Sequence, residues 1–190
     1  MLQRLLKMPV AFSIILIWVV VWLLVVIKDA GPALWGKGIN QVGGEYYRFV
    51  TAALTHTNFI HLFFNVCAMF WIGFLYEEHL GSIRFLLIAV LCAVISQVIF
   101  LCIYKNADQS FGGSVYVYAL CGFGLTMQCL LPDFPKMQWG TWSGNWLIIS
   151  LIAGNIPVLS FMNITTLFVH AISFGVGIVA AFVCKLLGMK

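Results

Sequence analysis

The chain has 190 residues, of which 63% are hydrophobic and only 8% are charged. Soluble domains carry about 25% charged residues, so this composition excludes an ordinary soluble domain and indicates an integral, multi-pass membrane protein. The net charge of +4 is small and scattered along the chain, which argues against nucleic-acid binding. Because no internal repeat, low-complexity tract or linker interrupts the sequence, we expect a single transmembrane domain over residues 1–190.

Six apolar segments approach the length of about 20 residues that a helix needs to span a bilayer. The first follows a basic N-terminus and exceeds the roughly 7–15 apolar residues of a cleavable signal peptide, so we interpret it as a retained span. The fifth contains Gly154 and Pro157, which predicts a kink or loose packing. The sequence therefore predicts an all-α membrane protein, a bundle of six transmembrane helices at residues 8–27, 57–76, 85–104, 112–131, 145–161 and 165–184.

The longest connection, residues 28–56, separates the first two predicted helices. It mixes Trp35, Tyr46, Tyr47 and Phe49 with glycines and polar residues, a composition typical of a loop that lies partly in the membrane interface. An even number of spans places both termini on one side of the membrane. Six basic residues fall on that side against four on the other, which favours cytoplasmic termini. The small size and the lack of a targeting segment lead us to expect a bacterial inner membrane.

Three polar side chains are expected at one depth near the same membrane surface. The second, fourth and sixth predicted helices all begin on the non-cytoplasmic side, and His61, Ser114 and His170 each lie a few residues inside them. At about 1.5 Å of rise per residue, they would lie roughly 3–9 Å below the surface. Polar and ionisable groups are costly inside a bilayer, so this coincidence of depth indicates a functional site.

A serine and a histidine at one depth suit nucleophilic catalysis. A serine hydroxyl is a weak nucleophile until a base removes its proton, and His170 is the candidate base for Ser114. No Asp or Glu lies at this depth, which predicts a dyad rather than a triad. Tyr118 lies one helical turn after Ser114, and we expect it to pack against the His170 ring.

The developing oxyanion needs hydrogen-bond donors aimed at it. The backbone N–H of Ser114 is one candidate, and the side chains of His61 and Asn65, which are four residues apart on one helix face, are two more. Small residues surround the serine and the histidine and allow their helices to approach closely. They are Gly112, Gly113, Gly122, Gly124, Ala171, Ser173, Gly175 and Gly177.

Five motifs, in this order between about residues 45 and 177, resemble the rhomboid family of intramembrane serine proteases: EYYRF, HTNFIHLFFN, GFLYEEHLGS, FGGSVYVYALCG and VHAISFGVG. The resemblance implies cleavage of transmembrane proteins near the membrane boundary, without metal or cofactor, and lateral access for the substrate beside the fifth helix.

Individual residues carry over from these motifs. The resemblance implies Ser114 as nucleophile and His170 as base, with Asn65 and His61 stabilising the oxyanion. His56, Gly112 and Tyr118 are expected to support the site, and Arg48 and Glu77 to brace or cap loops.

Tyr47 stands before Arg48 where the family usually has a tryptophan, and two further departures lie in the nucleophile and base motifs. Val115 follows the serine where the family has a glycine, and Ser173 replaces the first glycine of the base motif. Added bulk beside the nucleophile leaves open a second function, a catalytically inactive rhomboid pseudoprotease that binds membrane-protein clients.

A third alternative is a haem or metal protein that uses His56, His61 and His170, because histidines in a membrane bundle can ligate both. The substrate's identity and the oligomeric state stay open.

Overall fold

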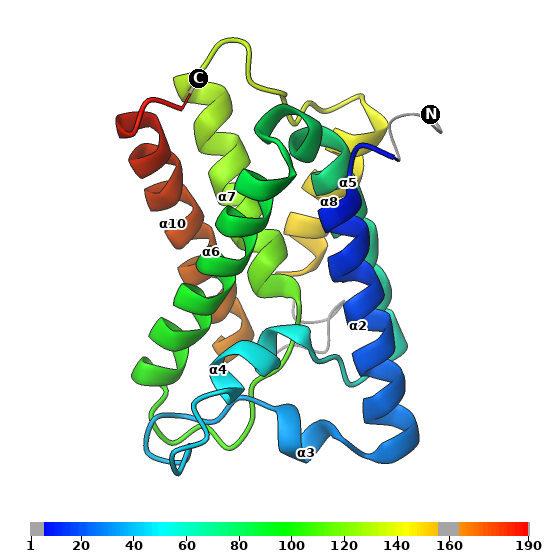
Figure 1. Ribbon diagram of the computed structural model, residues 1–190, viewed down its shortest axis with the longest axis vertical. Coiled ribbons are helices and arrows are strands. Elements are labelled where there is room, and N and C mark those ends of the chain that lie inside the picture. The colour runs from blue at the N-terminus through cyan, green and yellow to red at the C-terminus, as the bar shows by residue number, and fades with distance from the viewer. Residues whose placement is uncertain (1–5, 156–163, 190) are drawn as a thin grey trace.

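The computed structural model of the protein describes residues 6–155 and 164–189. Within those residues the chain is a bundle of helices without a strand, as Figure 1 shows. Four helices are long and apolar enough to cross a membrane, and two more are shorter and apolar. The first four are α2 (Pro9–Lys28), α5 (Phe59–Leu80), α6 (Ser82–Ile103) and α10 (Ile164–Leu186), and the shorter two are α7 (Ser114–Leu130) and α8 (Trp142–Ala153). The expected all-α membrane fold is confirmed.

The second helix begins and ends later than the predicted residues 57–76. The side chain of Asn58 caps α5, because its Oδ1 accepts a hydrogen bond of 2.8 Å from the backbone N–H of His61. Gly81 ends the helix with a φ of 78°, a conformation that favours glycine. The three residues at positions 77–79 are polar, which is why the apolar pattern stopped short of the true end.

The fifth helix differs from the predicted residues 145–161 at both ends. The Thr141 hydroxyl accepts a hydrogen bond of 3.1 Å from the Gly144 N–H, and α8 therefore starts at Trp142. Its last residue is Ala153, so Gly154 follows the helix instead of lying inside it. Residues 156–161 of the predicted segment, which include Pro157, lie outside the described residues.

Helix α7 occupies the centre of the bundle, with α5, α6 and α10 packed around it (Figure 1). Twelve of its 17 residues are buried. Helix α10 approaches it very closely: a Cβ added at Gly122 would overlap the carbonyl oxygen of Phe174, and one at Gly177 would overlap that of Ala119. The prediction that small residues bring these two helices together is confirmed at both positions.

The connection between α2 and α5 folds at one end of the bundle (Figure 1). It forms two short α-helices, α3 (Gly31–Leu34) and α4 (Arg48–Thr51), and the 3-10 helix η1 (Ala52–Leu54). This loop also holds the chain just before α7. Gly36 and Ser110 exchange two backbone hydrogen bonds of 2.8 Å, and the Gly112 N–H donates to the Ala52 carbonyl at 3.0 Å.

Arg48 braces the same loop from within. Its side chain is buried, and its guanidinium donates to the Glu45 carboxylate at 2.8 Å and to the carbonyl oxygens of Pro32 and Trp35 at 2.8 and 3.0 Å. The hydrogen bond from Arg48 holds the pKa of the exposed Glu45 carboxyl below its usual value. These contacts agree with the structural role expected for Arg48.

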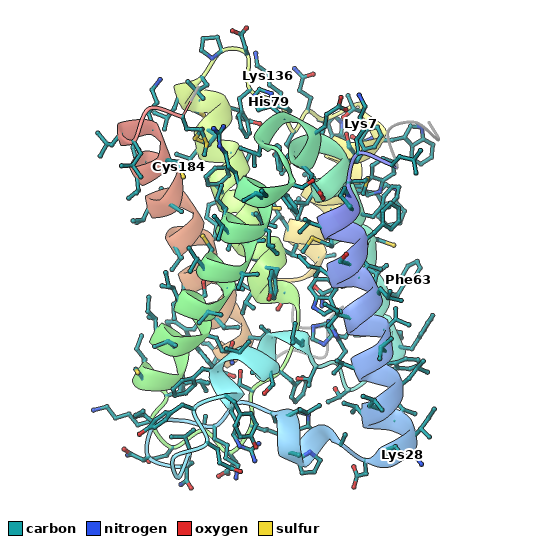
Figure 2. The ribbon with its side chains drawn as sticks, in the orientation of Figure 1. Lys7, Lys28, Phe63, His79, Lys136 and Cys184 are labelled. Atoms are coloured by element: carbon teal, nitrogen blue, oxygen red, sulfur yellow. The ribbon has the colours of Figure 1, made fainter. Side chains whose placement is uncertain are left out.

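The two ends of the bundle carry different parts of the chain. The start of α2 and the end of α10 lie at one end, and the connection between α2 and α5 lies at the other (Figure 1). Lys7 and Lys136 lie at the first end and Lys28 at the second, as Figure 2 shows. This is the arrangement that an even number of membrane crossings produces.

Helix α2 begins against a buried carboxylate at the end of α5. Glu77 is fully buried, and its two carboxylate oxygens accept hydrogen bonds from the backbone N–H groups of Val10 and Ala11 at 2.8 and 2.9 Å. The Ser82 hydroxyl donates a third bond at 2.9 Å. The first N–H groups of a helix have no intrahelical partner, and its positive end favours an anion. Glu77 therefore has the capping role expected of it, and it ties two helices together.

We expect Glu77→Gln to lower the free energy of unfolding by about 1.5–3 kcal/mol, the range for a hydrogen bond to a charged group. The amide keeps one acceptor oxygen but turns an NH₂ group toward the N–H donors of α2. Denaturant unfolding of the detergent-solubilised protein measures the loss. Glu78→Gln is the matched control: its carboxylate is half-exposed and pairs with Lys7, so we expect a change below about 1 kcal/mol. Equal losses in the two variants would contradict the capping role.

Candidate active site

A cavity of ≈ 520 Å³ opens among α5, α7, α8, α10 and the segment that precedes α7. Six of the seven predicted site residues line it, and they come from three helices and one loop: His61, Asn65, Gly112, Ser114, Tyr118 and His170. The seventh, His56, is fully buried and does not line the cavity.

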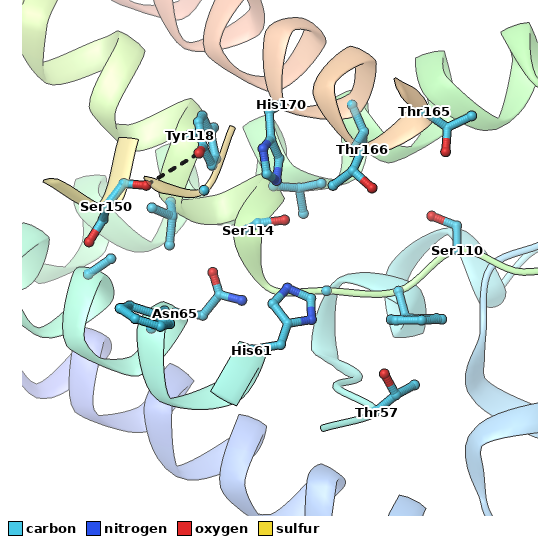
Figure 3. A pocket seen from close by; sticks show the side chains of 18 of the residues that line it. Thr57, His61, Asn65, Ser110, Ser114, Tyr118, Ser150, Thr165, Thr166 and His170 are labelled. Atoms are coloured by element: carbon cyan, nitrogen blue, oxygen red, sulfur yellow. Dashed lines mark hydrogen bonds between the residues drawn. The ribbon is translucent and has the colours of Figure 1, made fainter. Parts of the chain in front are cut away.

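Ser114 lies between two groups of side chains in the cavity. His170 and Tyr118 are on one side of it, and His61 and Asn65 are on the other (Figure 3). The serine therefore faces a candidate base and candidate hydrogen-bond donors at the same time.

Ser114 is the first residue of α7, not a residue two to four positions inside it as predicted. Helix α7 therefore starts deeper in the bundle than the neighbouring helix ends. The polar segment before it is hydrogen-bonded to the loop between α2 and α5. At the first residues of a helix the backbone N–H groups have no intrahelical acceptor, and the helix dipole is positive there. This start places the first backbone N–H group of α7, that of Ser114, directly beside the serine hydroxyl.

His170 lies in α10 with its ring stacked on that of Tyr118. The ring centroids are 3.8 Å apart and the planes differ by 12°, so the predicted ring contact is present. His170 is buried, and its Nδ1 lies 3.1 Å from Oδ1 of Asn155. Its other ring nitrogen, Nε2, is buried and has no hydrogen-bond partner among the residues that the structure describes. Asn155 thus holds Nδ1 of the candidate base, and Nε2 is available to interact with another group.

Asn155 is a site residue that sequence reasoning missed. It lies two positions after the end of α8, and its Nδ2 donates to the Tyr118 hydroxyl at 3.1 Å and to the Leu151 carbonyl at 2.7 Å. The prediction of a dyad rested on searching for acidic groups alone. An amide inside a predicted span is itself a costly polar group, and that signal would have marked Asn155 as a candidate but not shown its contact with His170.

His56 lies behind the cavity and holds two of the groups near the serine. Its Nε2 lies 3.1 Å from the Gly113 backbone N–H and 3.1 Å from Nδ2 of Asn65. A backbone N–H can only donate, so Nε2 is the acceptor and Asn65 turns its NH₂ group toward it. The ring of His56 also packs edge-on against Trp18 and His61. His56 thereby fixes the orientation of the Asn65 amide without itself reaching the cavity.

Gly112 brings the His61 ring close to the start of α7. Its φ of 132° lies in the range that favours glycine, and a Cβ there would come within 2.8 Å of Cε1 of His61. The same Cβ would lie 3.5 Å from the Ser114 hydroxyl oxygen. Only a residue without a side chain allows His61 and the serine to share this space.

The departures in the nucleophile and base motifs have different surroundings. Val115 is 2% exposed and lines the cavity directly after the serine, so its side chain takes space beside the candidate nucleophile. Ser173 is fully buried and donates to the Val169 carbonyl of its own helix at 2.7 Å. That bond keeps the hydroxyl inside α10, so Ser173 adds no polar group to the cavity.

Metal ligation finds no geometric support in residues 6–155 and 164–189. In that part of the chain, no group of three or more His, Cys, Asp or Glu side chains is placed to hold a metal ion. The three histidines of the third alternative belong instead to the hydrogen-bonded and stacked network around Ser114.

The apolar helices define an integral membrane protein, and its candidate site residues line a cavity between those helices. Comparison with known proteins identifies the family to which the chain belongs. The model of the Rhomboid domain matches residues 43–186. A protein of Bacillus subtilis (strain 168) named "Putative rhomboid protease YdcA" is 25% identical over 182 residues, which cover 93% of this chain and 88% of that protein. The chain therefore belongs to the rhomboid family.

Proposed function

We propose that this rhomboid is an intramembrane serine endopeptidase in which Ser114 is the nucleophile and His170 the base. One observation carries the proposal: both side chains face one cavity, and His170 presents an unpartnered ring nitrogen while its other nitrogen is held. The expected role of Tyr118 is to hold the His170 ring in place by stacking.

The chemistry is acyl transfer. Nε2 of His170 takes the hydroxyl proton as the Ser114 oxygen attacks the scissile carbonyl of the substrate. The resulting oxyanion is stabilised by the N–H of Ser114, the Asn65 amide and the His61 ring. His170 then gives its proton to the leaving amine, and the acyl-enzyme remains. A water molecule, deprotonated by the same nitrogen, attacks that ester and releases the acid product and the free serine.

The substrates that suit this site are transmembrane proteins cut near their membrane boundary. Polar side chains along one stretch of the cavity wall, Thr57, Gln109 and Ser110, would admit the water that the second half-reaction consumes. We place the protein in a bacterial inner membrane with cytoplasmic termini. The cavity then lies nearer the non-cytoplasmic surface, because the loop beside it is at the end opposite the termini.

A fluorescent fluorophosphonate tests whether Ser114 is activated. We expect the detergent-solubilised protein to be labelled covalently, and Ser114→Ala and His170→Ala to lose the label completely, because the first removes the nucleophile and the second its base. In-gel fluorescence measures the label, and the melting temperature of each variant confirms that it is folded. Undiminished labelling of folded Ser114→Ala would overturn the assignment of the nucleophile.

A pseudoprotease is the second candidate, and the position of Val115 beside the serine is the observation that favours it. Folded protein that takes no label while it captures membrane-protein clients stably would support this function. Appearance of label in Val115→Gly would then show that the added bulk had blocked the cavity.

A further inference from the structure

The geometry points to Asn155 as a positioning residue that holds His170 in the tautomer with the proton on Nδ1, through the end of α8. The inference rests on the proposed function only for its catalytic consequence. The tautomer itself follows from the hydrogen bonds of the described residues.

The first step is the orientation of the Asn155 amide. A backbone carbonyl oxygen accepts hydrogen bonds and never donates them, so the amide atom 2.7 Å from the Leu151 carbonyl is the NH₂ nitrogen. The same nitrogen donates to the Tyr118 hydroxyl at 3.1 Å. With both its N–H groups engaged, the amide presents Oδ1 to His170 and is not free to rotate by half a turn.

The second step is the protonation of His170. An amide oxygen accepts only, so the Nδ1 atom that lies 3.1 Å from it carries the hydrogen. In a neutral imidazole the other nitrogen then has a lone pair. That nitrogen, Nε2, is the one without a partner among the described residues, so it is the atom that can accept the serine proton.

The restraint on the amide matters because asparagine is normally an ambiguous partner for histidine. In serine proteases of the Ser-His-Asp type, changing the aspartate to asparagine lowers kcat by about 10⁴-fold, because the wrong tautomer forms. A freely rotating amide can present its NH₂ to the ring and reverse the tautomer. Here the hydrogen bond to the Leu151 carbonyl prevents this rotation. A neutral amide can therefore fix the histidine tautomer as the carboxylate does in those proteases.

The third step links this restraint to α8. The Tyr118 hydroxyl lies 3.5 and 3.3 Å from the carbonyl oxygens of Ser150 and Leu151 in the last turn of α8. A Cβ at Gly154 would overlap that hydroxyl, so the glycine permits the contact. The end of α8 therefore positions His170 in two ways. Its carbonyl groups hydrogen-bond the Tyr118 hydroxyl, whose ring stacks on His170, and Asn155 lies two positions after it and fixes the tautomer.

Nitrogen NMR of the intact protein in lipid nanodiscs tests the tautomer directly. The four histidines are labelled with ¹⁵N in their rings, and the signals are recorded near pH 8, above the usual histidine pKa of about 6.5. A His170→Gln sample identifies the two His170 signals. We expect a protonated Nδ1 and an unprotonated Nε2 in the wild type, and a mixture of both tautomers in Asn155→Ala. A wild-type ring protonated on Nε2, or an unchanged ring in Asn155→Ala, would overturn the proposal.

Kinetics test the consequence. We expect Asn155→Ala to lower the rate of fluorophosphonate labelling by about 100-fold, the effect of misplacing a catalytic group by about 1 Å. In a cleavage assay kcat should fall while KM stays constant, because no contact with bound substrate is removed. Asn155→Asp keeps an acceptor for Nδ1 and should recover labelling, which a merely structural asparagine would not require. Asn155→Asp as slow as Asn155→Ala would count against the assignment.

Asn145→Ala is the matched control, an asparagine inside α8, the helix that Asn155 follows. Its Oδ1 accepts a bond from the Gly140 N–H at 2.7 Å, and the residue does not line the cavity, so both the His170 signals and the labelling rate should stay at wild-type values. The two proposals fail separately. A tautomer change in Asn155→Ala without label in the wild type would reject the protease alone, and a labelled wild type matched by Asn155→Ala in both readouts would reject the positioning role alone.

Discussion

Alanine at Ser114 or at His170 should reduce cleavage of single-span membrane proteins by about 10⁴-fold or more. Loss of the serine or the histidine of a serine protease removes nearly all of the chemistry, because the two act as a unit, and the double variant should be no slower than either single one. The rate is measured with a panel of single-span reporter proteins co-reconstituted with the enzyme in liposomes. A Ser114→Ala variant that cleaves the reporters as fast as the wild type does would contradict the mechanism.

Ser96→Ala is the matched control for this experiment. Ser96 is also a fully buried serine in a membrane-spanning helix, but its hydroxyl donates to the Cys92 carbonyl of its own helix at 2.6 Å and does not reach the cavity. Its loss should leave cleavage unchanged. The comparison separates the chemistry of one hydroxyl from the general effect of removing a polar group inside the bundle.

Gly177→Ala should lower the free energy of unfolding by about 1–3 kcal/mol, as overpacking of a tight core does. The new methyl group would overlap the Ala119 carbonyl oxygen, which belongs to the backbone of α7 and cannot turn aside. Helix α10 must then move away from α7, and His170 moves with it away from Ser114. Denaturant unfolding in detergent measures the first effect, and fluorophosphonate labelling, which should fall, measures the second.

Gly175→Ala provides the contrast two positions earlier in the same helix. A Cβ at Gly175 meets no atom within 4 Å, so the substitution adds no overlap. Alanine is favoured over glycine in a helix interior by about 1 kcal/mol, and Gly175→Ala should be as stable as the wild type or more so. If both alanines lowered the free energy of unfolding equally, the loss at Gly177 could not be attributed to overlap with α7.

The sequence predicts the helices well where a long apolar run has a clear end. The first predicted helix, residues 8–27, differs from α2 by one residue at each end. Prediction was less accurate where capping side chains decide the boundary. Thr141 starts α8 before the apolar run begins, and the end of α5 includes Glu77, whose charge argues against a span until its hydrogen bonds to the start of α2 are known.

The candidate site was predictable where it depends on spacing within a helix or on paired small residues. The stacking of Tyr118 on His170 was expected because Tyr118 lies one turn after Ser114. Two features were not. Ser114 begins its helix because contacts between Gly36 and Ser110 hold the preceding segment, and Asn155 meets His170 because α8 ends at Ala153. Both depend on contacts between distant segments, which no local pattern in the sequence records.

The burial of α7 has a consequence for how the protein responds to its membrane. At about 1.5 Å per residue, its 17 residues extend about 25 Å, less than the hydrocarbon core of a bilayer, which is about 30 Å thick. A lipid-facing helix of that length would create hydrophobic mismatch and force the bilayer to thin or the helix to shift. Because its neighbours cover most of α7, acyl chains do not act on it directly. The depth of Ser114 is therefore set by the surrounding helices, and a change in lipid chain length reaches the serine only by moving the bundle as a whole.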